Sequence, residues 1–461
     1  MIRESLIKTA AMVVVILTLH SAAATQTRMP QIQFTDRTLK NGLRVISAPD
    51  HSSPTVSIQV WYHVGSKDDP NQRSGFAHLF EHMMFKSTLN MKSEMMDRLT
   101  EDVGGFNNAF TSDDVTVYYE VVPSNYLETL IWAEADRLAG LNVDDTNFKS
   151  ERDVVKEEYR QSVLAPPYGR FEFLLQQRSY VAHPYKRPTI GSIEDLDAAS
   201  LKDVQEFHAT NYRPDNATLV VVGDFDQKQL DGWVDKYFGP IAKPDRVLPR
   251  VGIKEPARKG EIRLTEYGIN ELPAVGLTFL TPGQSDPDTD ALDVAQAILG
   301  VGESARLYHT LVYEQQIAAE IAAQADSRED SSLFVVYAVL SEGKKPADAE
   351  RSILAEIKKL QEVPVSAAEL DKAKNQLVTN ALRERETSDG KALALGEAAV
   401  LLGDPKRANT DLARLQAVSA ADVQRVMRKY FNEANRLVLY YLPEASKTGN
   451  LQTHGAGKEG N

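Results

Sequence analysis

The feature that most constrains the fold of this chain is an internal repeat. A single offset of 219 residues aligns matching residues of the two halves, in the pairs Leu196 and Leu415, Ser200 and Ser419, Asp203 and Asp422, Tyr212 and Phe431, and Asn216 and Asn435. In both copies these residues lead into an apolar run typical of a strand, at 217–222 and 437–442. Solenoid units are only about 20 to 50 residues long. The repeat therefore predicts two duplicated domains that face each other instead of a stacked array.

Each half is predicted to combine strands with helices. Alternating apolar residues predict a strand near the start of each half, at 56–64 and 275–280, and a turn follows each strand. Helical apolar spacing occurs in both halves, at 75–85, 124–138, 289–299 and 347–360. The fold class is therefore α/β (α+β), with two duplicated halves that each contain a mixed sheet and helices.

A proline-rich segment separates the halves. Residues 241–260 are charged and contain several prolines, which leave little room for regular hydrogen-bonded structure. We interpret this segment as a linker between a first domain, 25–240, and a second domain, 261–445. The remaining residues, 446–461, are polar and rich in glycine, and we expect them to be disordered.

The N-terminus has the pattern of a secretory signal peptide. Arg3 and Lys8 precede an apolar run from Ala10 to Leu19, and small residues follow from Ser21 to Ala24. We expect cleavage after Ala24 and a periplasmic or secreted protein. An uncleaved membrane anchor is the alternative, but the apolar run is shorter than the roughly 20 residues of a membrane span. The chain has no cysteine, so disulfides cannot brace it.

The charge balance argues against a nucleic-acid partner. The chain has 65 Asp and Glu residues against 52 Lys and Arg residues, and a formal net charge of -13. A protein that grips phosphate backbones needs a basic surface. An acidic, solvated surface is the interpretation that this composition favours.

The segment from Gly75 to Phe85 carries the clearest chemical signal. His78 and His82 are four residues apart, so on a helix they share one face and can bind one metal ion. Glu81 leans towards the same face and can hold a water without being a ligand. Such histidines can also be a solvated pair. Apolar neighbours argue against that, because ionisable groups among buried side chains are costly unless something coordinates them.

A third ligand must come from elsewhere, because catalytic zinc usually has three protein ligands and one open position. The best candidate is an acidic helix at 148–160. Its Glu151 and Glu158 are seven residues apart and share a face, whereas Glu157 points towards solvent. Taken alone, this run is also typical of a surface helix with salt bridges.

These two segments, Gly75 to Thr88 and Glu151 to Arg160, resemble the signature segments of the pitrilysin (insulinase) family of zinc metallopeptidases. The resemblance gives Glu158 the role of third zinc ligand and Glu151 a supporting role that orients the site. It also makes Glu81 the group that activates the hydrolytic water. It implies one Zn2+ per chain, a clamshell of related α/β halves around a chamber, and an endopeptidase for short or unfolded peptides.

The segment from Gly104 to Thr111 is similar to the edge strand of that family, on which the peptide substrate is bound as an added strand. By this resemblance Asn108 hydrogen-bonds the substrate backbone, and Ala109, Phe110 and Thr111 present main-chain donors and acceptors. Without the resemblance, the Gly-Gly and Asn-Asn pairs would predict a plain hairpin.

The second half lacks residues that could bind a metal, and it also lacks an Arg and a Tyr that self-sufficient relatives carry. The positions that align with the histidines, 295–301, contain no plausible zinc donor. Self-sufficient relatives place an Arg and a Tyr, seven residues apart, where this chain has Val312 and Ala319, and neither side chain can donate a hydrogen bond. The resemblance therefore implies a heterodimer in which a related subunit supplies the Arg/Tyr pair and this chain supplies the zinc.

Two other functions remain open. The chain could be a scaffold subunit that binds extended peptides without cutting them, as some relatives do, or a periplasmic zinc-binding or delivery protein. Both are disfavoured because neither would need Glu81 beside two metal ligands.

Overall fold

The computed structural model describes residues 30–446. The predicted leader, 1–24, and residues 447–461 of the predicted tail lie outside the described residues. From Ile32 onward the described chain forms one compact unit that contains both halves of the repeat. Within residues 30–446, no helix is both long enough and apolar enough to cross a membrane.

The first half is built on a six-stranded sheet, in the order β1-β2-β6-β3-β5-β4. Its strands are β1 (Thr35–Thr38), β2 (Arg44–Pro49), β3 (Thr55–Tyr62), β4 (Phe106–Thr111), β5 (Thr116–Pro123) and β6 (Ala217–Gly223). Strands β2 and β6 are parallel, and the other pairs are antiparallel. Its helices are α2 (Phe76–Met83), α3 (Met95–Glu101), α4 (Leu127–Gly140), α5 (Asp145–Tyr159), α6 (Gly169–Ser179), α7 (Ile193–Ala198), α8 (Leu201–Asn211) and α9 (Gln227–Tyr237).

The second half repeats this order with five strands, β7-β11-β8-β10-β9. They are β7 (Ile262–Gly268), β8 (Ala274–Pro282), β9 (Ala318–Asp326), β10 (Ser331–Leu340) and β11 (Arg436–Pro443). Again one pair, β7 and β11, is parallel and the rest are antiparallel. The helices are α10 (Thr289–Gly300), α11 (Pro346–Glu362), α12 (Ala367–Glu384), α13 (Ser388–Val400), α14 (Arg407–Ala417) and α15 (Ala420–Tyr430).

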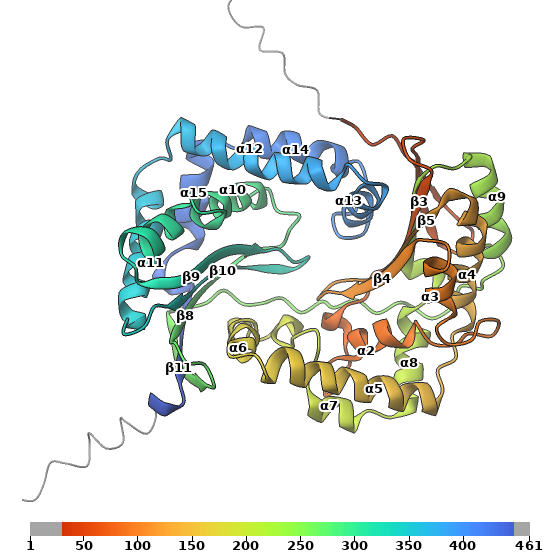
Figure 1. Cartoon of the computed structure of the whole chain (residues 1–461), viewed down its shortest axis with the longest axis horizontal. Helices are drawn as coiled ribbons and strands as arrows, with labels where there is room; N and C mark the ends of the chain where they lie inside the picture. Colours follow the sequence, from red (N-terminus) through yellow and green to blue (C-terminus); the bar gives the residue numbers. More distant parts are fainter. Residues whose placement is uncertain (1–29, 447–461) are drawn as a thin grey trace, which may run out of the picture. The chain divides into compact units, whose positions relative to one another are not determined.

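The predicted fold class is confirmed, because each half is a mixed sheet with helices packed on it (Figure 1), and the two sheets have the same strand order. The repeat is visible down to the helix caps. Ser200 and Ser419 each accept the N–H of an aspartate three residues on, and that aspartate bonds back to the serine in a capping box. Both boxes open equivalent helices, α8 and α15.

The two halves exchange one equivalent helix. On one face of the first sheet, Trp61 and Val220 pack against Leu395 and other residues of α13, which belongs to the second half. Conversely, Phe171 and Leu175 of α6, in the first half, pack on the second sheet. Helices α6 and α13 start 219 residues apart, at Gly169 and Ser388. Neither half therefore completes its core alone.

The predicted linker contains no helix or strand, and it is nonetheless fixed to the first half. Arg250 donates to the carbonyl of His63 at 2.9 Å. The carboxylate of Glu255 accepts the N–H groups of Val181 and His183, each at 2.7 Å. The segment thus has a defined course instead of acting as a free tether.

Candidate functional site

Helix α2 presents three ionisable side chains on one face and apolar ones on the other. Phe76, Phe80 and Met83 are buried in the main core of the first half, so the periodicity of the helix turns His78 and His82 away from that core. The start of the helix is fixed by the carboxylate of Asp69. It accepts the backbone N–H of Gly75 at 2.7 Å and that of Ala77 at 2.9 Å.

Helix α5 brings a carboxylate to the two imidazoles, and Figure 1 shows α5 running beside α2. One oxygen, Oε2 of Glu158, lies 3.3 Å from Nε2 of His82 and 3.7 Å from Nε2 of His78. The ligand atoms of these three residues all lie within 4.8 Å of one another. Glu157 is exposed, in agreement with the prediction that it points towards solvent, and it pairs with Arg160.

Two imidazole nitrogens and one carboxylate oxygen form a donor set that suits zinc. The structure brings together the three residues that the sequence singled out. The ring of His78 has one nitrogen, Nδ1, that is buried without a hydrogen-bond partner among residues 30–446. The other nitrogen, Nε2, is the one that faces Glu158, so the ring presents Nε2 to the point where the three ligand atoms meet.

The electrostatics of the site keep one imidazole neutral. Burial lowers the pKa of His78 to about 4, so its ring carries a free lone pair at neutral pH. Burial also opposes protonation of His82, but the hydrogen bond and charge of Glu158 outweigh it and raise the pKa of His82. The same contact lowers the pKa of Glu158. The carboxylate is therefore ionised and available as a ligand.

Glu81 lies beside this group and is held by the edge strand. Its Oε2 accepts a hydrogen bond from the Thr111 hydroxyl at 2.6 Å. Burial raises the pKa of Glu81, although the Thr111 contact opposes the rise. A carboxylate with a raised pKa can exchange a proton closer to neutral pH. The sequence assigned Thr111 only a main-chain role, so this side-chain contact was missed.

Strand β4 lies at the edge of the first sheet and pairs only with β5 among the described strands. Asn108 is exposed, and its Oδ1 accepts the backbone N–H of Ala109 at 2.8 Å. That N–H is thus covered by a side chain that an incoming strand can displace. Phe110 contacts the indole of Trp61 edge-on, at 6.1 Å between ring centroids.

Glu151 is buried and lies behind His82. Its Oε2 is 3.8 Å from Nδ1 of His82, while its Oε1 receives Lys86 at 2.9 Å and the Ser150 hydroxyl at 3.0 Å. Lys86 was not predicted from the sequence. The available signal was its position four residues after His82, because a chain that keeps turning past the end of α2 brings such a residue back near that histidine.

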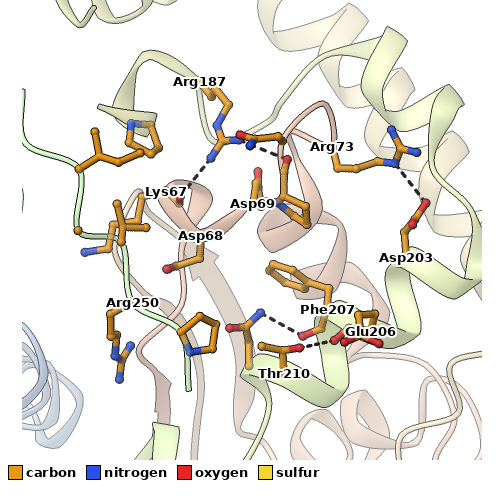
Figure 2. Close-up of a pocket in the computed structure, with 18 residues that line it drawn as sticks. Lys67, Asp68, Asp69, Arg73, Arg187, Asp203, Glu206, Phe207, Thr210 and Arg250 are labelled. Atoms are coloured by element: carbon orange, nitrogen blue, oxygen red, sulfur yellow. Dashed lines mark hydrogen bonds and ion pairs between the residues drawn. The ribbon is translucent and has the colours of Figure 1, made fainter. Parts of the chain in front are cut away.

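A large cavity lies elsewhere on the first half, by the segment that leads into α2 (Figure 2). Its volume is about 610 Å³ and Phe207, Asp69 and Arg187 are among its lining residues. Arg187 donates to the carbonyl of Lys67 at 3.1 Å. The lining contains none of the predicted catalytic, metal or substrate residues. The candidate site is therefore not this cavity but the cluster of His78, His82, Glu158 and Glu81, which lies between α2, α5 and β4.

Within residues 261–445, the second half contributes no equivalent donor set. The positions aligned with the histidines fall in α10, where Ala295 and Leu299 are buried in the core. Val312 lies in a short helix, η7 (Tyr308–Glu314), and Ala319 lies in β9. The nearby Arg306 is engaged by Glu369 through two hydrogen bonds of 2.7 Å.

Comparisons with known proteins agree with this arrangement. The family model described as Insulinase (Peptidase family M16) matches residues 44–192, and the one described as Peptidase M16 inactive domain matches 198–377. The chain is 30% identical to the zinc protease PqqE of Helicobacter pylori over 435 residues, which are 93% of this chain and 97% of that protein. It is 28% identical to a probable mitochondrial-processing peptidase subunit beta of Arabidopsis thaliana, covering 89% of this chain and 77% of that protein.

A solved structure is similar along nearly its whole length. The crystal structure of a protease from Helicobacter pylori matches with a TM-score of 0.87 and 29% identity, covering 90% of this chain and 100% of that one.

Proposed function

Because this chain belongs to the insulinase family of peptidases (family M16), we propose that it is a zinc-dependent endopeptidase that hydrolyses short or unfolded peptides. The observation that carries the proposal is the convergence of His78, His82 and Glu158 on one point, with Glu81 beside it. The names of its relatives, which include zinc proteases, support the same metal.

In this proposal each residue has a defined task. His78, His82 and Glu158 hold one Zn2+, which when bound polarises the scissile carbonyl and lowers the pKa of water. Glu81 accepts a proton from the attacking water and delivers it to the leaving amine nitrogen. Thr111 holds the carboxylate of Glu81 in place through its hydroxyl.

The substrate is proposed to bind along β4 as an added strand, because β4 lies next to Glu81 and has no second partner among the described strands. Asn108 would exchange its contact with the Ala109 N–H for one with the substrate backbone. Main-chain pairing of this kind favours extended peptides over folded proteins.

Substitution of Glu81 and Glu158 tests the chemistry. Glu81→Gln should retain zinc and lose about 100-fold to 10,000-fold in turnover, which is the usual contribution of a general base. Glu158→Gln should lose the zinc. Bound metal and hydrolysis of a quenched peptide would be measured, with the exposed Glu157→Gln as the control for a change on the same helix. A zinc-loaded Glu81→Gln protein that is still active would refute the assignment.

We further propose that the chain acts as the zinc-bearing member of a heterodimer and that it resides in the periplasm or is secreted. The support for a partner is that Val312 and Ala319 cannot donate to a substrate carbonyl. The isolated chain should be weakly active, and a related subunit that carries the Arg/Tyr pair should restore turnover. Full activity of the chain alone would exclude the partner. Zinc binding without turnover in either assay would favour a scaffold.

A further inference from the structure

The two histidines of the site differ in what lies behind them. Nδ1 of His78 is buried and has no hydrogen-bond partner in the described part of the chain, whereas Nδ1 of His82 faces Oε2 of Glu151 at 3.8 Å. The rings themselves are nearly perpendicular, with centroids 4.9 Å apart. Both rings face Glu158 through Nε2, but His82 also has a carboxylate behind it, at Nδ1, that can set its orientation.

Glu151 is itself held by two donors on its other oxygen. The ammonium of Lys86 lies 2.9 Å from Oε1, and the hydroxyl of Ser150 lies 3.0 Å from the same atom. The side chain of Glu151 is 6% exposed and that of Lys86 is 24% exposed. The carboxylate is thus shielded from water while the ammonium is half-buried, and an ion pair at this distance holds the carboxylate in place.

The backbone holds Lys86 at this position. Helix α2 ends at Met83, but the chain continues to turn, because the N–H of Lys86 donates to the carbonyl of Met83 at 3.1 Å. Lys86 thus comes from the α2 end of the site, while Glu151 comes from α5. The ion pair joins the two helices that carry the proposed metal ligands.

We propose that Lys86 is a positioning residue for the metal site: it holds Glu151 so that the free carboxylate oxygen orients His82. This inference rests on the proposed zinc site. Removal of an outer partner of a metal ligand typically weakens metal binding by about 10-fold to 100-fold. Loss of Lys86 should act through Glu151 and His82 and leave the fold of the two helices intact.

The test is the affinity of the metal-free, full-length chain for Zn2+, measured by competition with a chromophoric chelator. Lys86→Met keeps the aliphatic stem and should bind Zn2+ about 10-fold to 100-fold more weakly, while Lys86→Arg should recover most of the loss. Lys149→Met is the matched control, since it removes an exposed ion pair with Asp145 from α5. It should leave the affinity unchanged.

A second comparison separates positioning from general stability. In a Glu151→Gln background, the Lys86→Met change should have no further effect on Zn2+ affinity, because its route through Glu151 is already broken. Should Lys86→Met fail to fold in the metal-free state, Lys86→Gln takes its place in both comparisons. A wild-type affinity in the lysine variant, or an equal loss in the Glu151→Gln background, would overturn the inference. If the wild-type chain binds no Zn2+, the proposed function falls with it.

Discussion

The exchanged helix α13 makes a quantitative prediction at Gly396. An added Cβ atom there would lie 2.2 Å from Cε2 of Trp61, where ordinary contacts are 3.4 to 4 Å. The indole cannot move away easily. It is 2% exposed, its Nε1 donates to Gln59 at 2.9 Å, and Phe110 packs against it edge-on. Gly396→Ala therefore has to push α13 away from the first sheet.

Two opposing effects set the change in the free energy of unfolding that Gly396→Ala causes. Overpacking a closed core costs about 1 to 3 kcal/mol, and an overlap of more than 1 Å with a fixed ring places Gly396→Ala near the upper end. Replacing glycine by alanine inside a helix gains about 1 kcal/mol. The net expectation is a loss of about 2 kcal/mol in the free energy of unfolding.

Urea unfolding followed by tryptophan fluorescence would measure this loss, because all three tryptophans, Trp61, Trp132 and Trp233, lie in the first half. Gly232 gives the control. It lies inside α9, is exposed, and has nothing within 4 Å of its added Cβ. Gly232→Ala should stabilise the protein by about 1 kcal/mol, so the same chemical change has opposite signs at the two sites. A Gly396→Ala protein as stable as the wild type would refute the packing of α13 on Trp61.

Two further predictions concern pH and processing. The ring of His208 packs nearly parallel to the rings of Phe80 and Tyr212, at 5.6 and 5.5 Å between centroids, and burial lowers its pKa to about 4. Between pH 6.5 and 4 the unfolded chain therefore binds a proton that the folded chain does not, so stability falls as pH falls, by at most about 3 kcal/mol. His208→Phe should remove this part of the pH dependence in urea unfolding at pH 7 and 4.5, and an unchanged slope would contradict it. The leader should be cut after Ala24, so N-terminal sequencing of the exported protein should begin at Thr25, and an intact N-terminus would argue for an anchor.

Much of the fold could be predicted because the internal repeat gives the same pattern of strands and helices in both halves. The strands predicted at 217–222 and 437–442 are β6 and β11, and the helices predicted at 289–299 and 347–360 are α10 and α11. Local periodicity and capping residues decide such elements. The order of the strands and the exchange of α6 with α13 carry no local signal, because they depend on which apolar surfaces meet in space.

Some features of the candidate site could also be predicted from the sequence, and others could not. Spacing alone placed His78, Glu81 and His82 on one helix face, because four residues make about one turn. The resemblance added Glu158, and the structure brings its oxygen to both imidazoles. The hydroxyl of Thr111 on Glu81 and the ammonium of Lys86 on Glu151 were not predicted. The first of these contacts joins residues 30 positions apart, and periodicity says nothing about side chains on different elements.

The sequence by itself determined the duplication, the type of each main element and the identity of the residues that can bind a metal, since these depend on composition and spacing along one segment. Tertiary structure alone decided that one carboxylate oxygen meets two imidazoles, that Lys86 pairs with Glu151 behind them, and that each half packs a helix on the sheet of the other. The physical reason is that hydrogen bonds and packing act over a few ångströms in space, and distance along the chain does not set that separation.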